Sequence, residues 1–177
     1  MLKKSLFCLI LLTALSGCKK LDKLTQFRME FDESVVVPAA TQIDLPFDII
    51  TPEIETDSET TFSVNDTRKD LVEEIKLEKL TLSISLPSDA DFSFLNSVSI
   101  YLSAEGLPEV KIAWKENIPS NIGDTLELDV SDADLRQYLL KDSIKLRLNT
   151  ITDELITSDH HIDIHSVFWV DAKILGQ

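Results

Sequence analysis

The chain has 177 residues, a formal net charge of −14 at pH 7 and 44% hydrophobic residues. That length is typical of one domain with a sizeable hydrophobic core. The acidic balance excludes nucleic acid as an expected partner, because sequence-independent attraction to phosphates depends on lysine and arginine. The two cysteines, Cys8 and Cys18, lie in or beside the first apolar run, so no disulfide, thiol catalysis or zinc finger is expected in the body of the domain.

The chain begins with a segment typical of an export signal. Lys3 and Lys4 precede the apolar run LFCLILLTAL, residues 6–15. A transmembrane helix needs about 20 apolar residues, whereas the apolar centre of a secretory signal has about 7 to 15. The run is therefore predicted to be the centre of a signal peptide.

Directly after this run the sequence reads Leu15, Ser16, Gly17 and Cys18. The motif resembles the lipobox of bacterial lipoproteins, and the resemblance covers only the N-terminal segment. It implies that residues 1–17 are a signal peptide and that the Cys18 thiol carries a covalent lipid with acyl chains such as palmitate. Several chains give lasting membrane attachment, because a single chain binds only reversibly. An ordinary signal peptide with an incidental cysteine is the alternative.

Residues 18–26 are expected to form the lipid anchor and a short tether, and residues 27–177 the folded domain. In the lipoproteins that the motif resembles, an aspartate after the cysteine is the familiar signal for retention in the inner membrane. Lys19 stands at that position here. The resemblance therefore implies a protein of the cell envelope, anchored in the outer membrane and facing the periplasm, with the cell surface as the alternative.

The remainder of the chain is dominated by short segments in which apolar residues occupy every second position. This is the period of a β-strand with one buried and one solvated face, as antiparallel sheets permit. We expect a mainly β domain, a single antiparallel, immunoglobulin-like β-sandwich of about nine strands. The expected strands lie in residues 27–31, 43–49, 62–64, 80–86, 98–102, 110–114, 126–130, 144–148 and 162–174.

Two or three short helical turns are expected in the connections between strands. A hydroxyl residue followed three positions later by an acid is a helix-start signal, because the hydroxyl accepts from a free N–H and the acid faces the positive helix end. Two of these sites have similar sequences, SDADF and SDADL. We interpret them as a weak internal repeat, which arises either from duplication or from coincident capping chemistry. The signals occur at Thr67 and Asp70, Ser88 and Asp91, and Ser131 and Asp134.

All three histidines lie in the segment SDHHIDIHSVFWVDAKI, residues 158–174. If the alternate apolar residues from Ile162 onward face the core, the opposite face carries His161, Asp163, His165 and Trp169. Two imidazoles and a carboxylate suit zinc, copper or iron. However, a strand rises about 3.3 Å per residue, so His161 and His165 lie about 13 Å apart and do not readily share one ion. A solvated strand face is the main expectation, and a metal site completed from another strand is the alternative.

Trp169 is expected on the solvated face of this last strand. Large aromatic side chains on a wet surface are enriched at recognition sites for proteins and, through stacking, for sugars. Trp114, in contrast, shares its phase with Val110 and Ile112 and is expected in the core.

The chain lacks the G-x-S-x-G elbow of serine hydrolases, phosphate-binding glycine loops and dinucleotide-binding glycine motifs. We therefore expect a non-enzymatic binding or assembly module, with no cofactor beyond the covalent lipid on Cys18. A protein or glycan partner is expected around His161, His165 and Trp169. The alternatives are a metal-dependent envelope hydrolase that uses His161 or His165 with a carboxylate, and a purely structural envelope lipoprotein.

Overall fold

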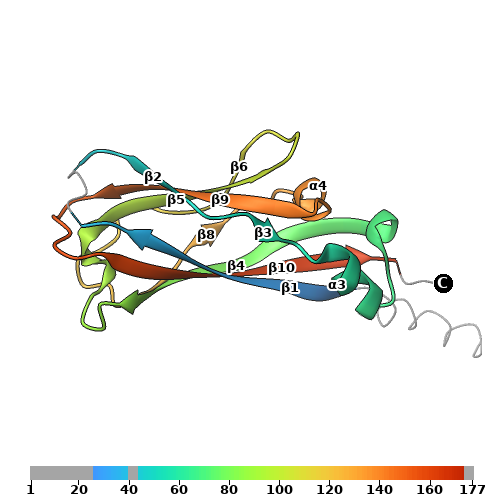
Figure 1. Cartoon of the computed structure of the whole chain (residues 1–177), viewed down its shortest axis with the longest axis horizontal. Coiled ribbons are helices and arrows are strands. Elements are labelled where there is room, and N and C mark those ends of the chain that lie inside the picture. The colour runs from blue at the N-terminus through green and yellow to red at the C-terminus, as the bar shows by residue number, and fades with distance from the viewer. Residues whose placement is uncertain (1–25, 40–43, 174–177) are drawn as a thin grey trace, which may run out of the picture.

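The computed structural model describes residues 26–39 and 44–173. Within these ranges the chain forms two antiparallel β-sheets that lie one over the other along the length of the molecule (Figure 1). We call the four-stranded sheet sheet A and the six-stranded sheet sheet B. The mainly β sandwich predicted from the alternation is confirmed. The lipobox with Cys18, and the residues Ile43 and Ile174, lie outside the described ranges.

Ten strands make up the two sheets in the described part of the chain. Sheet A has the order β1, β10, β4 and β7, and these strands span Gln26–Val37, His160–Ala172, Val72–Leu86 and Thr125–Glu127. Sheet B has the order β2, β9, β5, β6 and β8, with β3 also paired to β9. Its strands β2, β3, β5, β6, β8 and β9 span Phe47–Ile50, Ile54–Glu55, Leu95–Ala104, Val110–Lys115, Asp129–Val130 and Ser143–Thr152.

The core lies between the sheets, and β10 shows how the sequence builds it. Burial alternates residue by residue along this strand, with Ile162, Ile164, Phe168 and Val170 all turned inward. The ring of Phe168 is 1% exposed and packs edge-on against a phenylalanine of β1. The predicted register of this segment is confirmed, and it fixes which side chains face solvent.

The strand predicted at residues 62–64 is wrong, because these residues belong to the helix α3 (Ser58–Val64). Phe62 is fully buried and its ring centroid lies 6.0 Å from that of Phe27, whereas Val64 is 74% exposed. Positions two apart share a face in a strand but lie on opposite sides of a helix. A single pair of apolar residues is too short a pattern to distinguish a strand from a helix.

Short helical turns form close to all three predicted starts: the 3-10 helices η3 (Lys69–Leu71) and η4 (Phe92–Phe94), and α4 (Arg136–Leu139). The capping chemistry differs from the prediction in part. Thr67 does not cap η3 and instead donates to the carbonyl oxygen of Lys173 at 2.6 Å. Asp91 caps η4 and accepts from the N–H of Ser93 at 2.9 Å. Asp134 accepts from the N–H of Arg136 at 3.0 Å, but the N-cap position of α4 is Leu135.

The expectation that Trp114 lies in the core is wrong. The pairing of β5 with β6 contains a register shift, and beside it Ile112 and Ala113 are both fully buried. This irregularity reverses the alternation, so that Trp114 is half-buried on the outer face of sheet B. There the Nζ of Lys111 lies 5.0 Å from the centroid of the indole ring.

The described chain begins and ends at the same end of sheet A (Figure 1). Gln26, at the start of β1, pairs with Asp171, near the end of β10. At the opposite end Val36 pairs with His161, and His161 also pairs with Leu86 of β4. Ten residues of extended strand separate Gln26 from Val36, which corresponds to about 33 Å.

Candidate functional site

The outer face of sheet A carries the three residues predicted to contact a partner. His161, His165 and Trp169 lie on β10 at positions that face away from the core, because the alternate residues between them are buried. Successive members of the set are four residues apart, which corresponds to about 13 Å along the strand. The structure thus places all three on one face but in three separate surroundings.

His161 lies at the end of this face that is farthest from Gln26. Its cross-strand neighbours are Val36 on β1 and Leu86 on β4. Val36 is 43% exposed and Leu86 is 53% exposed, and His161 between them is also exposed. The three residues form a row across three adjacent strands in which an imidazole is flanked by two aliphatic side chains.

His160, directly before it, points inward instead. Its ring Nδ1 lies 2.8 Å from the carbonyl oxygen of Ser158, and the ring packs edge-on against Phe94 at 4.9 Å between centroids. This histidine is 9% exposed and serves the packing of the core.

The residues weighed as metal ligands are each engaged with β1. The Nδ1 of His165 lies 2.7 Å from Oδ1 of Asp32, and the hydroxyl of Ser34 donates to the carboxylate of Asp163. His161 has the aliphatic neighbours described above. In residues 26–39 and 44–173, no group of three His, Cys, Asp or Glu side chains is arranged to hold a metal ion.

Trp169 lies between charged side chains of both neighbouring strands. It pairs with Arg28 on β1 and with Lys76 on β4. Arg28 reaches across the face to Glu78 of β4, with Nε to Oε2 at 2.5 Å and Nη2 to Oε1 at 2.7 Å. Since β10 lies between β1 and β4, this ion pair spans β10 next to the indole. Trp169 is therefore half-buried among charges rather than an open aromatic platform.

The ion pair between Arg28 and Glu78 perturbs both groups. The hydrogen bond from Arg28 lowers the pKa of the Glu78 carboxyl, and the same contact raises the pKa of the guanidinium. Both side chains are about half exposed, at 57% and 42%, so solvent screening leaves the pair a small contribution to stability.

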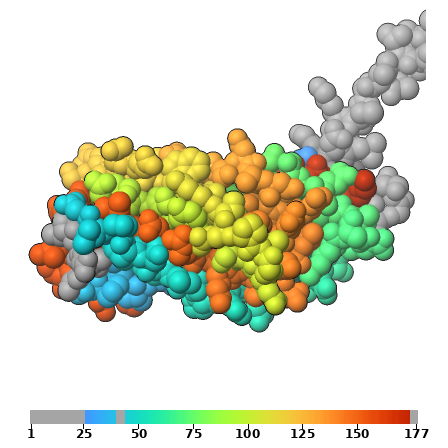
Figure 2. All heavy atoms as spheres, turned by 90° about the horizontal axis from the view of Figure 1, so that it is seen from above, coloured from blue at the N-terminus to red at the C-terminus, as the bar shows by residue number. Residues whose placement is uncertain are grey.

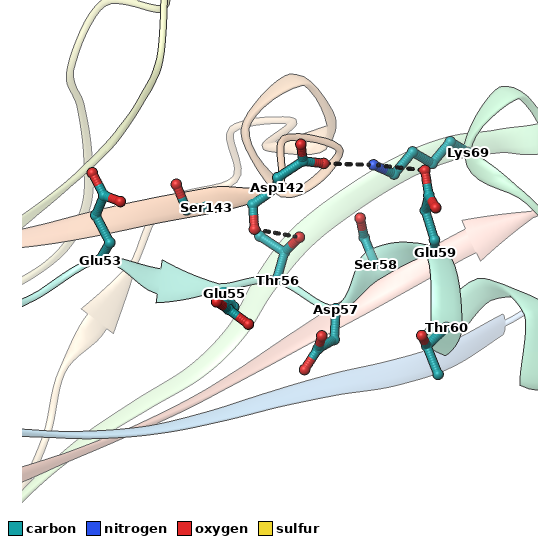
Figure 3. A pocket seen from close by; sticks show the side chains of 10 residues that line it. All are labelled: Glu53, Glu55, Thr56, Asp57, Ser58, Glu59, Thr60, Lys69, Asp142 and Ser143. Atoms are coloured by element: carbon teal, nitrogen blue, oxygen red, sulfur yellow. Dashed lines mark hydrogen bonds and ion pairs between the residues drawn. The ribbon is translucent and has the colours of Figure 1, made fainter.

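An acidic cleft that the sequence reasoning missed lies where β3 leads into α3 (Figure 3). Its volume is about 470 Å³, and it is lined by residues 53, 55–60, 69, 142 and 143. Lys69 lies within it, 3.3 Å from the carboxylate of Asp142 and 3.6 Å from that of Glu59. Glu55 and Asp57 point away from Lys69, toward the side on which β1 runs (Figure 3). The signal in the sequence was the run of acids in residues 53–59.

The outer face of sheet B holds a network centred on Arg147 of β9. Its Nη1 lies 2.7 Å from Oδ1 of Asp48, and its Nε and Nη2 bind both carboxylate oxygens of Glu109 at 2.9 and 2.6 Å. The guanidinium carbon lies 4.2 Å from the ring centroid of Tyr101. Figure 2 looks onto the side of the molecule where the segments that supply these residues lie next to one another.

This network shifts the titration of its carboxyls. Hydrogen bonds from Asn149 first and Arg147 second lower the pKa of Asp48, and the hydrogen bond from Arg147 lowers the pKa of Glu109. The same contacts raise the pKa of the Arg147 guanidinium. No sequence signal identified the network, because its partners come from β2, β5, β9 and the connection between β5 and β6.

Within the described ranges, none of the helices has the length and apolar character needed to cross a membrane.

No known family model matches the chain, and neither does any curated protein. Solved structures that resemble it include N-glycanase F (PNGase F), at 16% identity with a TM-score of 0.43, and a decameric BFDV capsid protein, at 7% with a TM-score of 0.44. Another is FLHE, at 8% identity with a TM-score of 0.35. These matches cover 85%, 84% and 82% of this chain, and 43%, 98% and 98% of the other chains. This chain thus spans less than half of the N-glycanase chain, and likenesses this weak carry no inference about its function.

Proposed function

We propose that the protein is a lipid-anchored, non-enzymatic binding module of the bacterial cell envelope, and that a protein partner docks on the outer face of sheet A. The lipobox that ends at Cys18 supports the anchor, since a lipidated cysteine attaches an exported domain to a bilayer. Lys19 after the cysteine favours the outer membrane with the domain in the periplasm, and the cell surface is the alternative location.

The observation that carries the docking proposal is the row of Val36, His161 and Leu86. Two exposed aliphatic side chains flank an exposed imidazole on three adjacent strands. The row lies at the end of sheet A opposite Gln26, and the proposed anchor precedes Gln26 in the chain. A tether of eight residues extends at most about 28 Å. A domain held by Cys18 can thus present this row away from the bilayer.

The chemistry of the row favours a protein over a glycan as the partner. Covering the exposed apolar area of Val36 and Leu86 stabilises a complex by about 25 cal/mol for each Å². A glycan instead gains most from stacking on an open aromatic ring. On this face the indole of Trp169 is half-buried beside the ion pair of Arg28 and Glu78. We therefore assign the apolar contact to the His161 row and a polar flank to His165 and Trp169.

Photo-cross-linking in the intact envelope tests this proposal. A photo-reactive amino acid replaces Leu86 in one variant and Val64 in a matched control, since Val64 is also exposed but lies in α3, near the other end of the molecule. We expect a discrete cross-linked protein from position 86 only. Adding V36S and H161A should remove it without changing the thermal midpoint, because both residues are exposed.

Cross-linking of equal strength from both positions, or a product that survives V36S and H161A, would overturn the docking face.

The anchor is tested separately by Cys18→Ser. This variant should leave the membrane fraction and appear in the soluble fraction of the envelope. Complete recovery of Cys18→Ser with membranes would remove the lipid anchor from the proposal while leaving the docking face to its own test.

A further inference from the structure

The two long edges of sheet A differ in whether their backbone groups are occupied. The edge at β4 is covered by residues 124–136: β7 pairs with it, Leu128 donates to the carbonyl oxygen of Leu80 at 3.0 Å, and Leu135 donates to that of Ile75 at 2.7 Å. At the other edge, β1 pairs only with β10 among the described residues. An antiparallel strand directs about half of its N–H and C=O groups to each side. The outer side of β1 is therefore a strand edge that no other described residue pairs with.

A groove runs beside this edge. It has a volume of about 370 Å³ and is lined by residues 28–31 of β1 on one side and by residues 55–57 and 61 on the other. Met29 and Phe31 alternate toward the core, with Met29 buried and Phe31 partly buried against Phe168. The groove thus combines free backbone groups along one wall with apolar side chains of the core at its base.

The groove is also acidic. Glu30, Glu55 and Asp57 line it, and none of the three makes an ion pair with another described residue. The one basic residue in the lining, Arg28, is bound to Glu78 on the outer face. Glu55 and Asp57 point toward the side on which β1 runs (Figure 3). The lining thus holds three acids and one base, and the groove carries a net negative charge.

We propose that the edge of β1 at residues 28–31 binds an extended peptide of a partner protein, in which basic and apolar residues alternate, as an added strand of sheet A. Pairing with a free strand edge satisfies backbone groups on both chains, and alternate side chains provide specificity. Apolar residues of the peptide point inward over Met29 and Phe31. Lysine or arginine at the intervening positions faces Glu30, and the peptide ends reach Glu55 and Asp57.

The same charges disfavour a second copy of this chain at this edge. If two β1 strands paired antiparallel around Phe31, Glu30 of one copy would lie opposite Asp32 of the other. Like charges directly opposite each other destabilise a strand pair. The site is distinct from the His161 row, which lies toward the far end of the sheet, so the two proposals fail or succeed independently.

The probe is a capped peptide of sequence Lys-Val-Lys-Val-Lys-Val-Lys with a fluorescent label, titrated with the full chain in non-ionic detergent. Its extended length of about 23 Å exceeds that of residues 28–31. We expect saturable binding that weakens as salt is added, because exposed charge pairs are screened. Hydrogen exchange should slow at residues 28–31 when the peptide is bound, because their edge N–H groups gain acceptors.

Two matched controls separate edge pairing from general attraction to an acidic protein. The same peptide with every backbone nitrogen methylated keeps its charges but cannot donate to a strand edge. The variant E55Q/D57N removes two groove charges, and asparagine tolerates the positive φ of 45° at position 57. The variant E116Q/E154Q removes two charges from exposed connections elsewhere.

We expect no binding of the methylated peptide, a loss of about fivefold with E55Q/D57N and a change within about twofold with E116Q/E154Q. Equal binding of the methylated peptide would overturn the added strand. Equal losses in the two double variants would overturn the groove as the location. Absence of any binding, or a dimer of the chain that shields residues 28–31 from exchange, would overturn the proposal as a whole.

Discussion

The outer faces of the two sheets are both polar, but they are organised differently. On sheet B, Arg147 gathers Asp48, Glu109 and the ring of Tyr101 into one network. On sheet A, Arg28 binds Glu78 across β10, His165 contacts Asp32 separately, and His161 has aliphatic neighbours instead. Sheet B exposes one large aliphatic side chain, Ile50, beside Arg147, whereas sheet A has two, Val36 and Leu86, on either side of His161. We infer that sheet B contributes its outer face to stability and that sheet A offers its outer face to a partner.

The two faces differ in how strongly the central arginine is fixed by its neighbours. The Arg147 side chain is 24% exposed and shares its ordering cost among three partners, whereas the Arg28 side chain is 57% exposed and has one carboxylate partner. Fixing a long side chain costs up to about 2 kcal/mol of conformational entropy, so a single exposed pair gains little net stability. When one arginine binds several partners, the entropy of ordering its side chain is lost only once, and each further interaction adds to the net stability.

Among the substitutions that test this comparison, Arg147→Met should have the largest effect on the free energy of unfolding. It removes the charged hydrogen bonds to Asp48 and Glu109 together with the contact to Tyr101, and we expect a loss of about 2 kcal/mol in the free energy of unfolding. Arg28→Met on sheet A should cost clearly less, because its ion pair with Glu78 is exposed to solvent. Urea denaturation of the two variants measures both values, and equal losses would contradict the assignment of a stabilising network to sheet B.

A pH series sharpens the same comparison with a somewhat smaller effect. The pKa values of Asp48 and Glu109 are lowered in the folded protein by hydrogen bonds from Asn149 and Arg147. A carboxyl whose pKa is lowered by folding stabilises the folded state above its unfolded pKa, which is near 4. That stabilisation is lost as the pH falls through the folded value. The stability gap between wild type and Arg147→Met should therefore narrow as the pH falls from about 5 into the acid range.

Denaturation midpoints of both proteins across that range provide the measurement. Arg28→Met serves as the control, because the pKa of Glu78 is also lowered but its arginine partner is 57% exposed, whereas Arg147 is 24% exposed. Its gap to wild type should be small at every pH. A gap for Arg147→Met that stays constant down to the acid limit would show that lost packing, rather than the two carboxylates, accounts for the effect.

The sequence predicted those parts of the fold that depend on local alternation. The inward residues of β10 and the solvent-facing positions of His161, His165 and Trp169 follow from a period of two that runs through an uninterrupted strand. The same rule failed at Trp114, because a register shift between β5 and β6 reverses the phase. Such a shift is set by the partner strand, which one segment of sequence does not contain.

The features of the surface that were missed share a tertiary origin. The network around Arg147 joins residues up to 101 positions apart, and no local pattern marks them. The groove beside β1 exists because β1 is an edge strand, and strand order is set by the whole fold. The acids in residues 53–59 are visible in the sequence, but only the structure places Glu55 and Asp57 at an unpaired edge.

A smaller effect is expected from Trp169→Ala. The indole is half-buried on the outer face, so its loss should lower the free energy of unfolding by no more than about 1 kcal/mol. The neighbouring Phe168→Ala is the matched control, because this ring is 1% exposed and its removal from the core should cost about 3 to 5 kcal/mol. Thermal or urea unfolding distinguishes the two variants. If Trp169→Ala lost as much unfolding free energy as Phe168→Ala, the outer face of sheet A would contribute to stability as we infer for sheet B.

The smallest effect on stability, and the sharpest on partner capture, is expected from His161→Ala. This side chain is exposed and its neighbours Val36 and Leu86 are exposed as well, so the free energy of unfolding should change by less than about 0.5 kcal/mol. The cross-link from position 86 should nevertheless weaken, because the imidazole is the centre of the proposed row. Arg147→Met should show the reverse, with lower stability and an unchanged cross-link at a temperature where it remains folded. If each substitution instead changed both properties together, the division of labour between the two outer faces would fail, since stability and docking would then depend on one connected surface.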